Sequence, residues 1–462
     1  MNRLSTLMLP ILLIPLTQQT CGSAPTRSEQ LLEQLVLYHQ PFIDRGQADE
    51  VAEKYQLLAS SPLTFFRGTA FIFFWDAARD ESLNSSAYLV DSLGYVWLQG
   101  DLHIGNLGVL STDADLQFYD LNDMDEAALG PWLWDIRRLA TSHYLTALEL
   151  GLSTSKADEV LSRSLLAYVE ALAQFSGSDD ELDEQLTADT ARGEIQELLE
   201  KAAQQSQLAL LEPYTDGAGG FTSAGGDLQP VSASLFQATQ EQMPLFVASL
   251  PQEVRKSSSY YNIKDMARRL NAGVGSLPAY RYYVLLEGKS TDDDDDRILD
   301  LKEARESSVT QNFETSSLPT STEAERQLYA MTRAWQDCRE LLGTMTLEGM
   351  HFRVVERHAE KADLDLEGEI GDDAGKLKTV VEQQSWLAAR FLARLNQDLA
   401  ADTVPFDADG AVWSVVARDP DGFVAETRAF AQTYAAQVQT DFEIFAEALA
   451  EDPLLGAQAG VR

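Results

Sequence analysis

Apolar residues recur at two different spacings along the chain, and the two spacings predict different elements. Between residues 28 and 60 they fall three or four positions apart, which is the period of one helix face. The short apolar runs at 95–98 and 116–119 are typical of buried strands. Helical spacing returns from residue 132 to about 208 and dominates again from 377 to 450.

The second half of the chain contains a strand-rich region. Residues 280–286 and 298–302 are strand-like, and the aspartates at 292–296 between them predict the turn of a hairpin. Such a charge run is usually a solvated loop, with calcium binding as the alternative. A helix is predicted from about 322 to 342, and a strand at 351–355.

These elements predict an α+β fold with a mostly helical large lobe and a small lobe built on an antiparallel sheet. The length of 462 residues suits two lobes. The predicted parts are a signal segment at 1–23, the helical lobe with the functional loops at 24–212, a Gly/Ser/Thr/Pro-rich linker at 213–232, the small lobe at 233–360 and the C-terminal helices of the large lobe at 361–462.

The N-terminus has the pattern of an export signal. Arg3 precedes an apolar stretch at 7–16 that is too short to span a bilayer as a helix. Cys21 stands where a bacterial lipoprotein would be cleaved and acylated. We therefore expect an exported protein of the periplasm or cell envelope, attached to the membrane through Cys21 if that residue is lipidated.

The charge of the chain excludes one class of partner. It has 73 acidic and 35 basic residues, for a formal charge of −38. Such a surface repels phosphate backbones, so nucleic acid is not expected as a partner.

The strongest chemical signal lies between residues 99 and 126. Asp101 follows a predicted strand, Asn106 comes five residues later, and Asp120 ends the next predicted strand. Phosphoryl transfer needs a carboxylate that positions the attacking hydroxyl and oxygen ligands for Mg²⁺. Asp101 suits the first role, and Asn106 and Asp120 suit the second, with Asp123 as a further metal ligand. We expect Asp101, Asn106 and Asp120 to converge in one cleft.

Two of these roles stay open. His103 is a candidate catalytic residue, although hydrogen bonding within the loop is its more ordinary role. Asp123 and Asp125 either bind metal or pair with Arg137 and Arg138. In the plainest interpretation, the aspartates and Asn106 only cap turns.

A second group of residues is typical of a nucleotide site. Gly273, Gly275 and Ser276 form a turn whose N–H groups can approach phosphate, and Lys302 lies on a predicted strand beyond it. Glu323 or Glu325 on the following helix is the expected partner of the lysine charge, with Glu325 favoured. We expect Lys302 to reach the same cleft as Asp120. Alternatively, the glycines form an ordinary turn and Lys302 lies on the surface beside its neighbouring acids.

Gly100-Asp101-Leu102-His103, Asn106 and Asp120 resemble the catalytic and metal-binding loops of aminoglycoside phosphotransferase and choline kinase relatives, with Gln99 in place of the family's leading His. The resemblance implies a protein-kinase-like architecture. Because the glycine turn and Lys302 follow the catalytic loop instead of preceding it, the order of the lobes would be permuted.

A closer resemblance is to domain-of-unknown-function family 2252, a bacterial family. It is carried by Phe66-Arg67-Gly68, by residues 100–103 and 120–139, and by 273–276 and 301–304, and it covers roughly residues 30 to 450. This family supplies no substrate.

We therefore expect a kinase-like phosphotransferase that uses ATP and Mg²⁺ to transfer a phosphoryl or nucleotidyl group to a hydroxyl of a small-molecule or protein substrate. Two alternatives remain. One is an exported, non-catalytic kinase-like binding protein. The other is a metal-dependent phosphoester hydrolase built on Asp101, Asp120 and Asp123.

Overall fold

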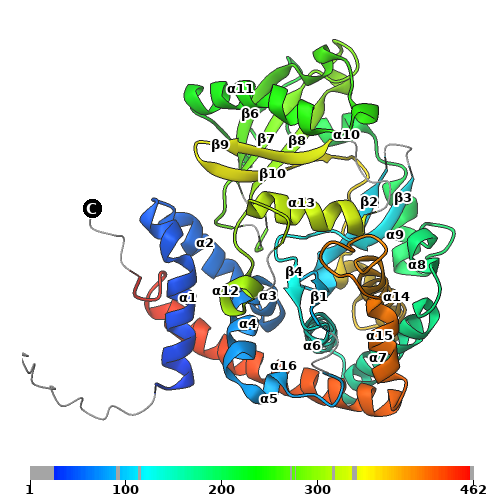
Figure 1. The fold of residues 1–462 in the computed structure, drawn as a ribbon. Helices are drawn as coiled ribbons and strands as arrows, with labels where there is room; N and C mark the ends of the chain where they lie inside the picture. The colour runs from blue at the N-terminus through cyan, green and yellow to red at the C-terminus, as the bar shows by residue number, and fades with distance from the viewer. Residues whose placement is uncertain are drawn as a thin grey trace, which may run out of the picture.

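The computed structural model describes residues 25–89, 94–112, 116–270, 273–275, 277–314, 318–335 and 341–457. The expected signal at 1–23, with Cys21, lies outside this range. The described segments are mostly helical, with antiparallel sheets (Figure 1), so the predicted α+β class is confirmed. No helix within them is both long and apolar enough to cross a bilayer.

One six-stranded antiparallel sheet dominates the strand-rich part, in the order β5-β6-β7-β8-β10-β9. Its strands are β5 (Leu228–Pro230), β6 (Ile263–Arg269), β7 (Arg281–Leu286), β8 (Arg297–Glu303), β9 (Leu342–Leu347) and β10 (Met350–Arg357). Helix α11 (Ala233–Ser249) packs on one face through an apolar core that includes Phe246, Val284, Leu299 and Val354. Burial of these side chains holds helix and sheet together.

The opposite face of this sheet is charged near its middle. Side chains alternate along a strand, so Lys302 on β8 points away from the core that Leu301 joins. Arg281 on β7 and Arg353 on β10 are the register partners of Lys302. Three cationic residues therefore lie side by side on adjacent strands of one face.

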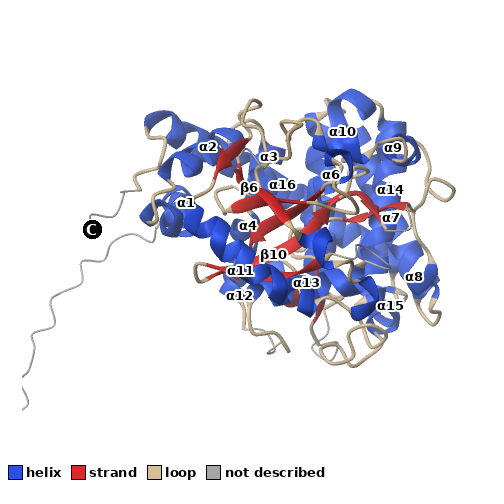
Figure 2. Ribbon diagram, turned by 90° about the horizontal axis from the view of Figure 1, so that it is seen from above, coloured by secondary structure: helices blue, strands red, loops and turns tan. Residues whose placement is uncertain are grey.

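Most of the remaining helices come from both ends of the chain and share one core, which runs from Leu31 to Leu449, whereas Leu211 of α10 (Gln207–Leu211) packs against Tyr283, Leu285 and Ile298 of the sheet. The remaining helices are α1 (Arg27–Asp44), α2 (Ala48–Leu58), α3 (Pro62–Gly68), α4 (Ala70–Arg79), α5 (Glu81–Asn84), α6 (Leu133–Glu149), α7 (Thr154–Phe175), α8 (Asp180–Asp183), α9 (Glu194–Ala202), α10 (Gln207–Leu211), α12 (Ser308–Asn312), α13 (Glu323–Ala334), α14 (Ala374–Arg394), α15 (Ala408–Val416) and α16 (Pro420–Glu451). Seen from above (Figure 2), strands lie near the middle, with α1 and α2 on one side and α7, α9 and α14 on the other.

Two short hairpin-like pairs carry the loops of interest. Strand β1 (Val96–Leu98) pairs with β4 (Ala128–Gly130), and β2 (Leu107–Ser111) pairs with β3 (Gln117–Leu121). The loop after β1 and the loop after β3 therefore emerge next to each other. Both lie below the sheet, beside α13 (Figure 1).

Three sequence predictions about elements need correction. The helix predicted to reach residue 342 ends at Ala334, and strand β9 begins at Leu342. Strand β6 was not predicted, because charged residues interrupt its apolar pattern. The predicted linker at 213–232 is not only a loop, since β5 within it forms the edge of the large sheet.

Candidate functional site

The loop after β1 is held from below by the first turn of α6. The carboxylate of Asp135 accepts the backbone N–H of Gln99 at 2.6 Å and that of Gly100 at 3.0 Å. Gly100 has a φ of +83°, and a Cβ there would collide with the backbone of Glu126. The left-handed conformation and the close approach both require glycine. This anchoring fixes the backbone from which Asp101 projects.

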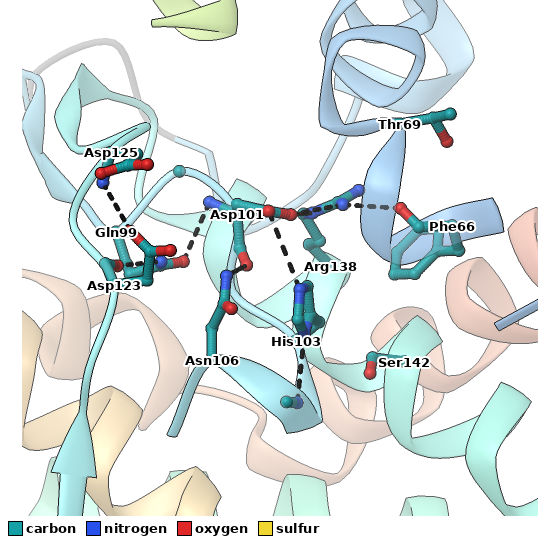
Figure 3. Close-up of polar contacts among 12 residues, drawn as sticks. Phe66, Thr69, Gln99, Asp101, His103, Asn106, Asp123, Asp125, Arg138 and Ser142 are labelled. Carbon is teal, nitrogen blue, oxygen red and sulfur yellow. Dashed lines mark hydrogen bonds and ion pairs between the residues drawn. The ribbon is translucent and has the colours of Figure 1, made fainter. Parts of the chain in front are cut away.

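Asp101 points at a buried guanidinium. Its Oδ1 accepts from Arg138 Nε at 2.8 Å, and its Oδ2 lies 3.7 Å from His103 Nε2 (Figure 3). Arg138 also donates to the carbonyl of Phe66 at 2.9 Å and stacks on the Phe66 ring. The orientation of Asp101 is therefore set by groups that are themselves locked in the core.

Burial controls the protonation of this loop. It raises the pKa of the Asp101 carboxyl to about 7; Arg138 opposes that rise and Glu126 adds to it. Burial, helped by Arg67, lowers the pKa of His103 well below its ordinary value, so the ring is neutral. His103 Nδ1 accepts the Gly105 N–H at 3.0 Å, which places the ring proton on Nε2, facing Asp101. In this arrangement His103 holds the loop and orients Asp101.

Asn106 closes the same loop. Its side-chain N–H donates to the Asp101 carbonyl at 2.9 Å, and its side chain lines the central cavity. Among the described residues no donor reaches its side-chain oxygen. That oxygen is the atom that could bind a cation.

Lys302 reaches this cavity from the sheet, as the sequence predicted. Its ammonium lies 3.3 Å from Asp123 Oδ2 and forms a shorter ion pair with Asp125. Arg353 Nη2 lies 3.5 Å from the other Asp125 oxygen. The Lys302 side chain is only 6% exposed, so its charge depends on these two carboxylates. The contact joins the sheet to the loop after β3.

Asp120 does not belong to the cavity. Its carboxylate accepts from Arg390 of α14 at 2.9 Å and from the Leu121 N–H at 2.8 Å, and it is buried away from the cavity lining. The prediction that Asp120 converges with Asp101 was wrong. The alternation of β3 turns Asp120 toward α14, and the carboxylates that enter the cavity are those of Asp123 and Asp125, beyond the strand end.

Glu325 is also placed differently. It lies in the first turn of α13, where its carboxylate accepts the Ser321 N–H at 2.6 Å and its own N–H donates to the N-cap side chain of Thr322. The predicted ion pair between Lys302 and Glu325 is therefore absent from the described structure. Gly273 and Gly275 line the cavity as expected, whereas Ser276 lies outside the described residues.

The cavity has a volume of about 260 Å³ and an unusual charge balance. Of its described lining residues six are basic and seven acidic, whereas acids outnumber bases about two to one in the whole chain. The basic residues are Arg67, Arg281, Lys302, Arg305, Arg353 and Lys361, and the acidic ones are Asp101, Asp123, Asp125, Glu126, Asp300, Glu303 and Asp363. A very acidic protein thus brings basic and acidic residues nearly into balance at one place.

Of these six basic residues only Lys302 was predicted from the sequence, and two of the other five, Arg67 and Arg305, differ from the rest in their contacts. The Arg67 guanidinium packs flat on Gly105, where a Cβ would lie 2.6 Å from it, and Arg305 stacks over Tyr38 and Phe42. Within the described residues neither is ion-paired with a carboxylate. Arg67 carried a signal as part of the Phe66-Arg67-Gly68 motif, but nothing near Arg305 indicated its position.

Comparison with known proteins gives one match. A family described as an uncharacterized protein conserved in bacteria, domain-of-unknown-function family 2252, matches residues 45–448. Neither the curated proteins nor the solved structures contain a match.

Proposed function

The chain belongs to domain-of-unknown-function family 2252, and we propose that it is a kinase-like phosphotransferase that uses ATP and Mg²⁺ to phosphorylate a hydroxyl-bearing substrate. One observation carries the proposal: the buried strand lysine Lys302 meets Asp123 and Asp125 in the cavity that Asp101 and Asn106 line. A phosphate-binding lysine, acidic metal ligands and a positioning carboxylate are the parts that phosphoryl transfer requires.

The oxygen ligands in the cavity fit a magnesium ion. Asp123, Asp125 and the side-chain oxygen of Asn106 are hard donors of the kind that Mg²⁺ prefers. Asp125 Oδ1 is buried without a hydrogen bond among the described residues, and Arg353 Nη2 lies 3.5 Å from it, so a cation would replace this ion pair. When bound, Mg²⁺ neutralises the charge of the transferred phosphate. Lys302 and Arg353, which contact these carboxylates here, would then bind phosphate oxygens.

The cation-rich lining supports a polyphosphate ligand. Arg67 and Arg305 are unpaired with acids in the described structure, and guanidinium groups bind phosphate in bidentate fashion. Gly273, with a φ of +93°, allows backbone N–H groups to approach a phosphate closely. Because these glycines and Lys302 follow the Asp101 loop in sequence, the proposal includes a permuted order of the two kinase-like lobes.

Asp101 has the properties of the residue that receives the substrate proton. In the proposed step the substrate oxygen forms a bond to the γ-phosphorus, the bond from that phosphorus to the bridging oxygen of ADP breaks, and the hydroxyl proton passes to Asp101. A pKa of about 7 places this carboxyl near the pH at which a general base works best. Arg138 and His103 keep it oriented.

The test is ATP turnover, measured as ADP formed with Mg²⁺ in the presence of a mixture of hydroxyl-bearing metabolites. Asp101→Asn should lower turnover by about 10²–10⁴-fold. Asp296→Asn is the matched control, because Asp296 is a buried, ion-paired aspartate outside the cavity, and its turnover should stay within about twofold. Equal turnover in wild type and Asp101→Asn would overturn the proposal. ATP binding without turnover would indicate a binding protein, and metal-dependent cleavage of phosphoesters without ATP would indicate a hydrolase.

A further inference from the structure

A second group of carboxylates gathers away from the cavity, on the helical part of the molecule. Asp179 precedes the short helix α8, Glu181 lies within α8, and Asp398 follows α14. One carboxylate oxygen from each of the three lies within 4.8 Å of the others. None of the three lines the Asp101 cavity. Segments separated by more than two hundred residues thus bring like charges together.

Glu181 distinguishes this group from an ordinary acidic surface. The residue is 1% exposed, and its Oε2 atom is buried without a hydrogen-bond partner in the described structure. A buried carboxylate oxygen without a partner is unfavourable, because it has lost water and gained nothing in return. Burial, with the charges of Asp398 and Asp179, raises the pKa of Glu181.

The surroundings add further negative charge. Asp409 in α15 lies close enough to be influenced by Glu181: burial and Asp407 raise the pKa of Asp409 to about 7, and the charge of Glu181 contributes. The nearby cation is Arg394 of α14. Its Nη1 donates to the backbone carbonyls of Glu181 at 3.0 Å and Leu182 at 2.9 Å, so it is directed at the backbone.

We infer that Asp179, Glu181 and Asp398 form a binding site for a divalent cation, with calcium as the best fit. The three donors are carboxylate oxygens, which hard cations prefer, and oxygens that share one Ca²⁺ at about 2.3–2.6 Å lie up to about 5 Å apart. A cation here supplies the partner that Glu181 Oε2 lacks. It also ties α8 to the segment after α14 and thereby stabilises the fold.

The aspartate run at 292–296 is a less suitable calcium site. Lys264 forms ion pairs with Asp293 and with Asp296, the latter at 2.8 Å, so two of the five carboxylates already have a cationic partner. Asp294 in the middle of this run is exposed, which makes it a useful control for unspecific effects of added cation.

Thermal unfolding of the full chain with and without millimolar Ca²⁺ tests the site. Calcium should raise the wild-type Tm by at least about 2 °C, beyond the effect of NaCl at equal ionic strength. Glu181→Gln should lose this shift and, without calcium, should be at least as stable as wild type, because it removes a buried charge. Asp294→Asn should keep the full shift. An absent wild-type shift, or an equal shift in wild type and Glu181→Gln, would overturn the inference.

If Glu181→Gln folds poorly, calorimetric titration with CaCl₂ tests the site through another residue. Asp398→Asn changes an exposed partner of the same group and should bind one Ca²⁺ fewer per chain than wild type. Asp123→Asn separates this site from the Asp101 cavity, because it should keep the calcium binding that Asp398→Asn loses. Unchanged stoichiometry in Asp398→Asn would contradict the assignment.

Discussion

Asp101 illustrates how burial sets the chemistry of one side chain. An ordinary aspartate has a pKa near 4, but burial raises that of Asp101 to about 7 against the opposing charge of Arg138. Between about pH 4 and 7 the folded protein therefore binds a proton that the unfolded chain does not. By linkage, this proton makes folding more favourable at the acidic end of that window, and the contribution is lost as the pH rises through 7.

Asp101→Asn removes this titration, which gives the first prediction. The free energy of unfolding of wild type, relative to the variant, should fall as the pH rises from 5 to about 7, by at most about 1.4 kcal/mol per pH unit, and then level off. Urea unfolding of wild type and Asp101→Asn at pH 5, 6, 7 and 8 measures this difference in the free energy of unfolding. Asp135, whose pKa burial also raises to about 7, is present in both proteins and cancels. A difference that does not vary with pH would show that the Asp101 pKa is not raised.

A substitution at Gly100, compared with one at Gly151, separates the cost of a left-handed backbone from the cost of a steric collision. Gly100→Ala places a Cβ against Glu126 in a left-handed conformation, whereas Gly151→Ala has a similar φ of +79° and nothing within 4 Å. The control should cost about 1–2 kcal/mol for the backbone conformation alone. Gly100→Ala should lose clearly more free energy of unfolding, as measured by chemical denaturation. Equal losses would mean that the loop moves freely away from Glu126.

The sequence identified those site residues whose signals are local. Asp101 and Asn106 lie five residues apart in one loop, and Lys302 stands on a recognisable strand. The prediction for Asp120 was wrong because its partner, Arg390, lies far along the chain on α14. Nothing in the sequence near residue 120 indicates this contact. The sequence left the role of Asp125 open between a metal ligand and a partner of Arg137 and Arg138. The position of Asp125 depends on the register of β8, which brings Lys302 above it.

Among the elements, α13 connects the sheet to the functional loops. Arg326, which is 3% exposed, donates to the backbone carbonyl of Asp125 at 2.9 Å and also to that of Ala127. Trp335 just beyond the helix donates to the Leu121 carbonyl at 2.6 Å. These bonds fix the backbone that presents Asp123 and Asp125 to Lys302.

Arg326→Met should therefore destabilise the fold, by about 1–3 kcal/mol for each buried carbonyl left without a donor. Arg255→Met is the control, since Arg255 also donates to backbone carbonyls, of Ala248 and Leu250, but is partly exposed and far from the loop. The control variant should lose much less free energy of unfolding, as measured by chemical denaturation. A similar loss in both variants would indicate that α13 does not support the loop.

The elements that the sequence missed have a common physical cause. Strand β6 carries Lys264, Asp265 and two arginines, and ion pairs such as that of Arg268 with Glu50 at 2.7 Å replace apolar contacts at its edges. Strand β9 alternates buried Gly343, Met345 and Leu347 with threonines against its partner β10, but this short pattern follows directly on a helical one. Tertiary contacts decide such segments, and a single sequence does not display them.

Across the whole molecule, acidic residues outnumber basic ones about two to one, whereas the cavity lining holds nearly as many basic residues as acidic ones. A chain with a formal charge of −38 repels anions at long range, yet six basic side chains line the cavity between the sheet and the β1 and β3 loops. A polyphosphate ligand therefore gains its affinity from close contacts, and binding should depend strongly on those cations. Lys302 is the most buried lysine among them and lies at the centre of the charged row.

Binding of ATP with Mg²⁺, measured by isothermal titration calorimetry, tests this arrangement most directly. The wild-type chain should bind the nucleotide, and Lys302→Met should weaken the affinity by about 10–100-fold, as expected for the loss of a charge-assisted phosphate contact. Lys264→Met removes another ion-paired lysine of the same sheet, outside the cavity, and should leave the affinity unchanged. Equal affinity in wild type and Lys302→Met, or no binding by the wild-type chain, would contradict a nucleotide site in this cavity.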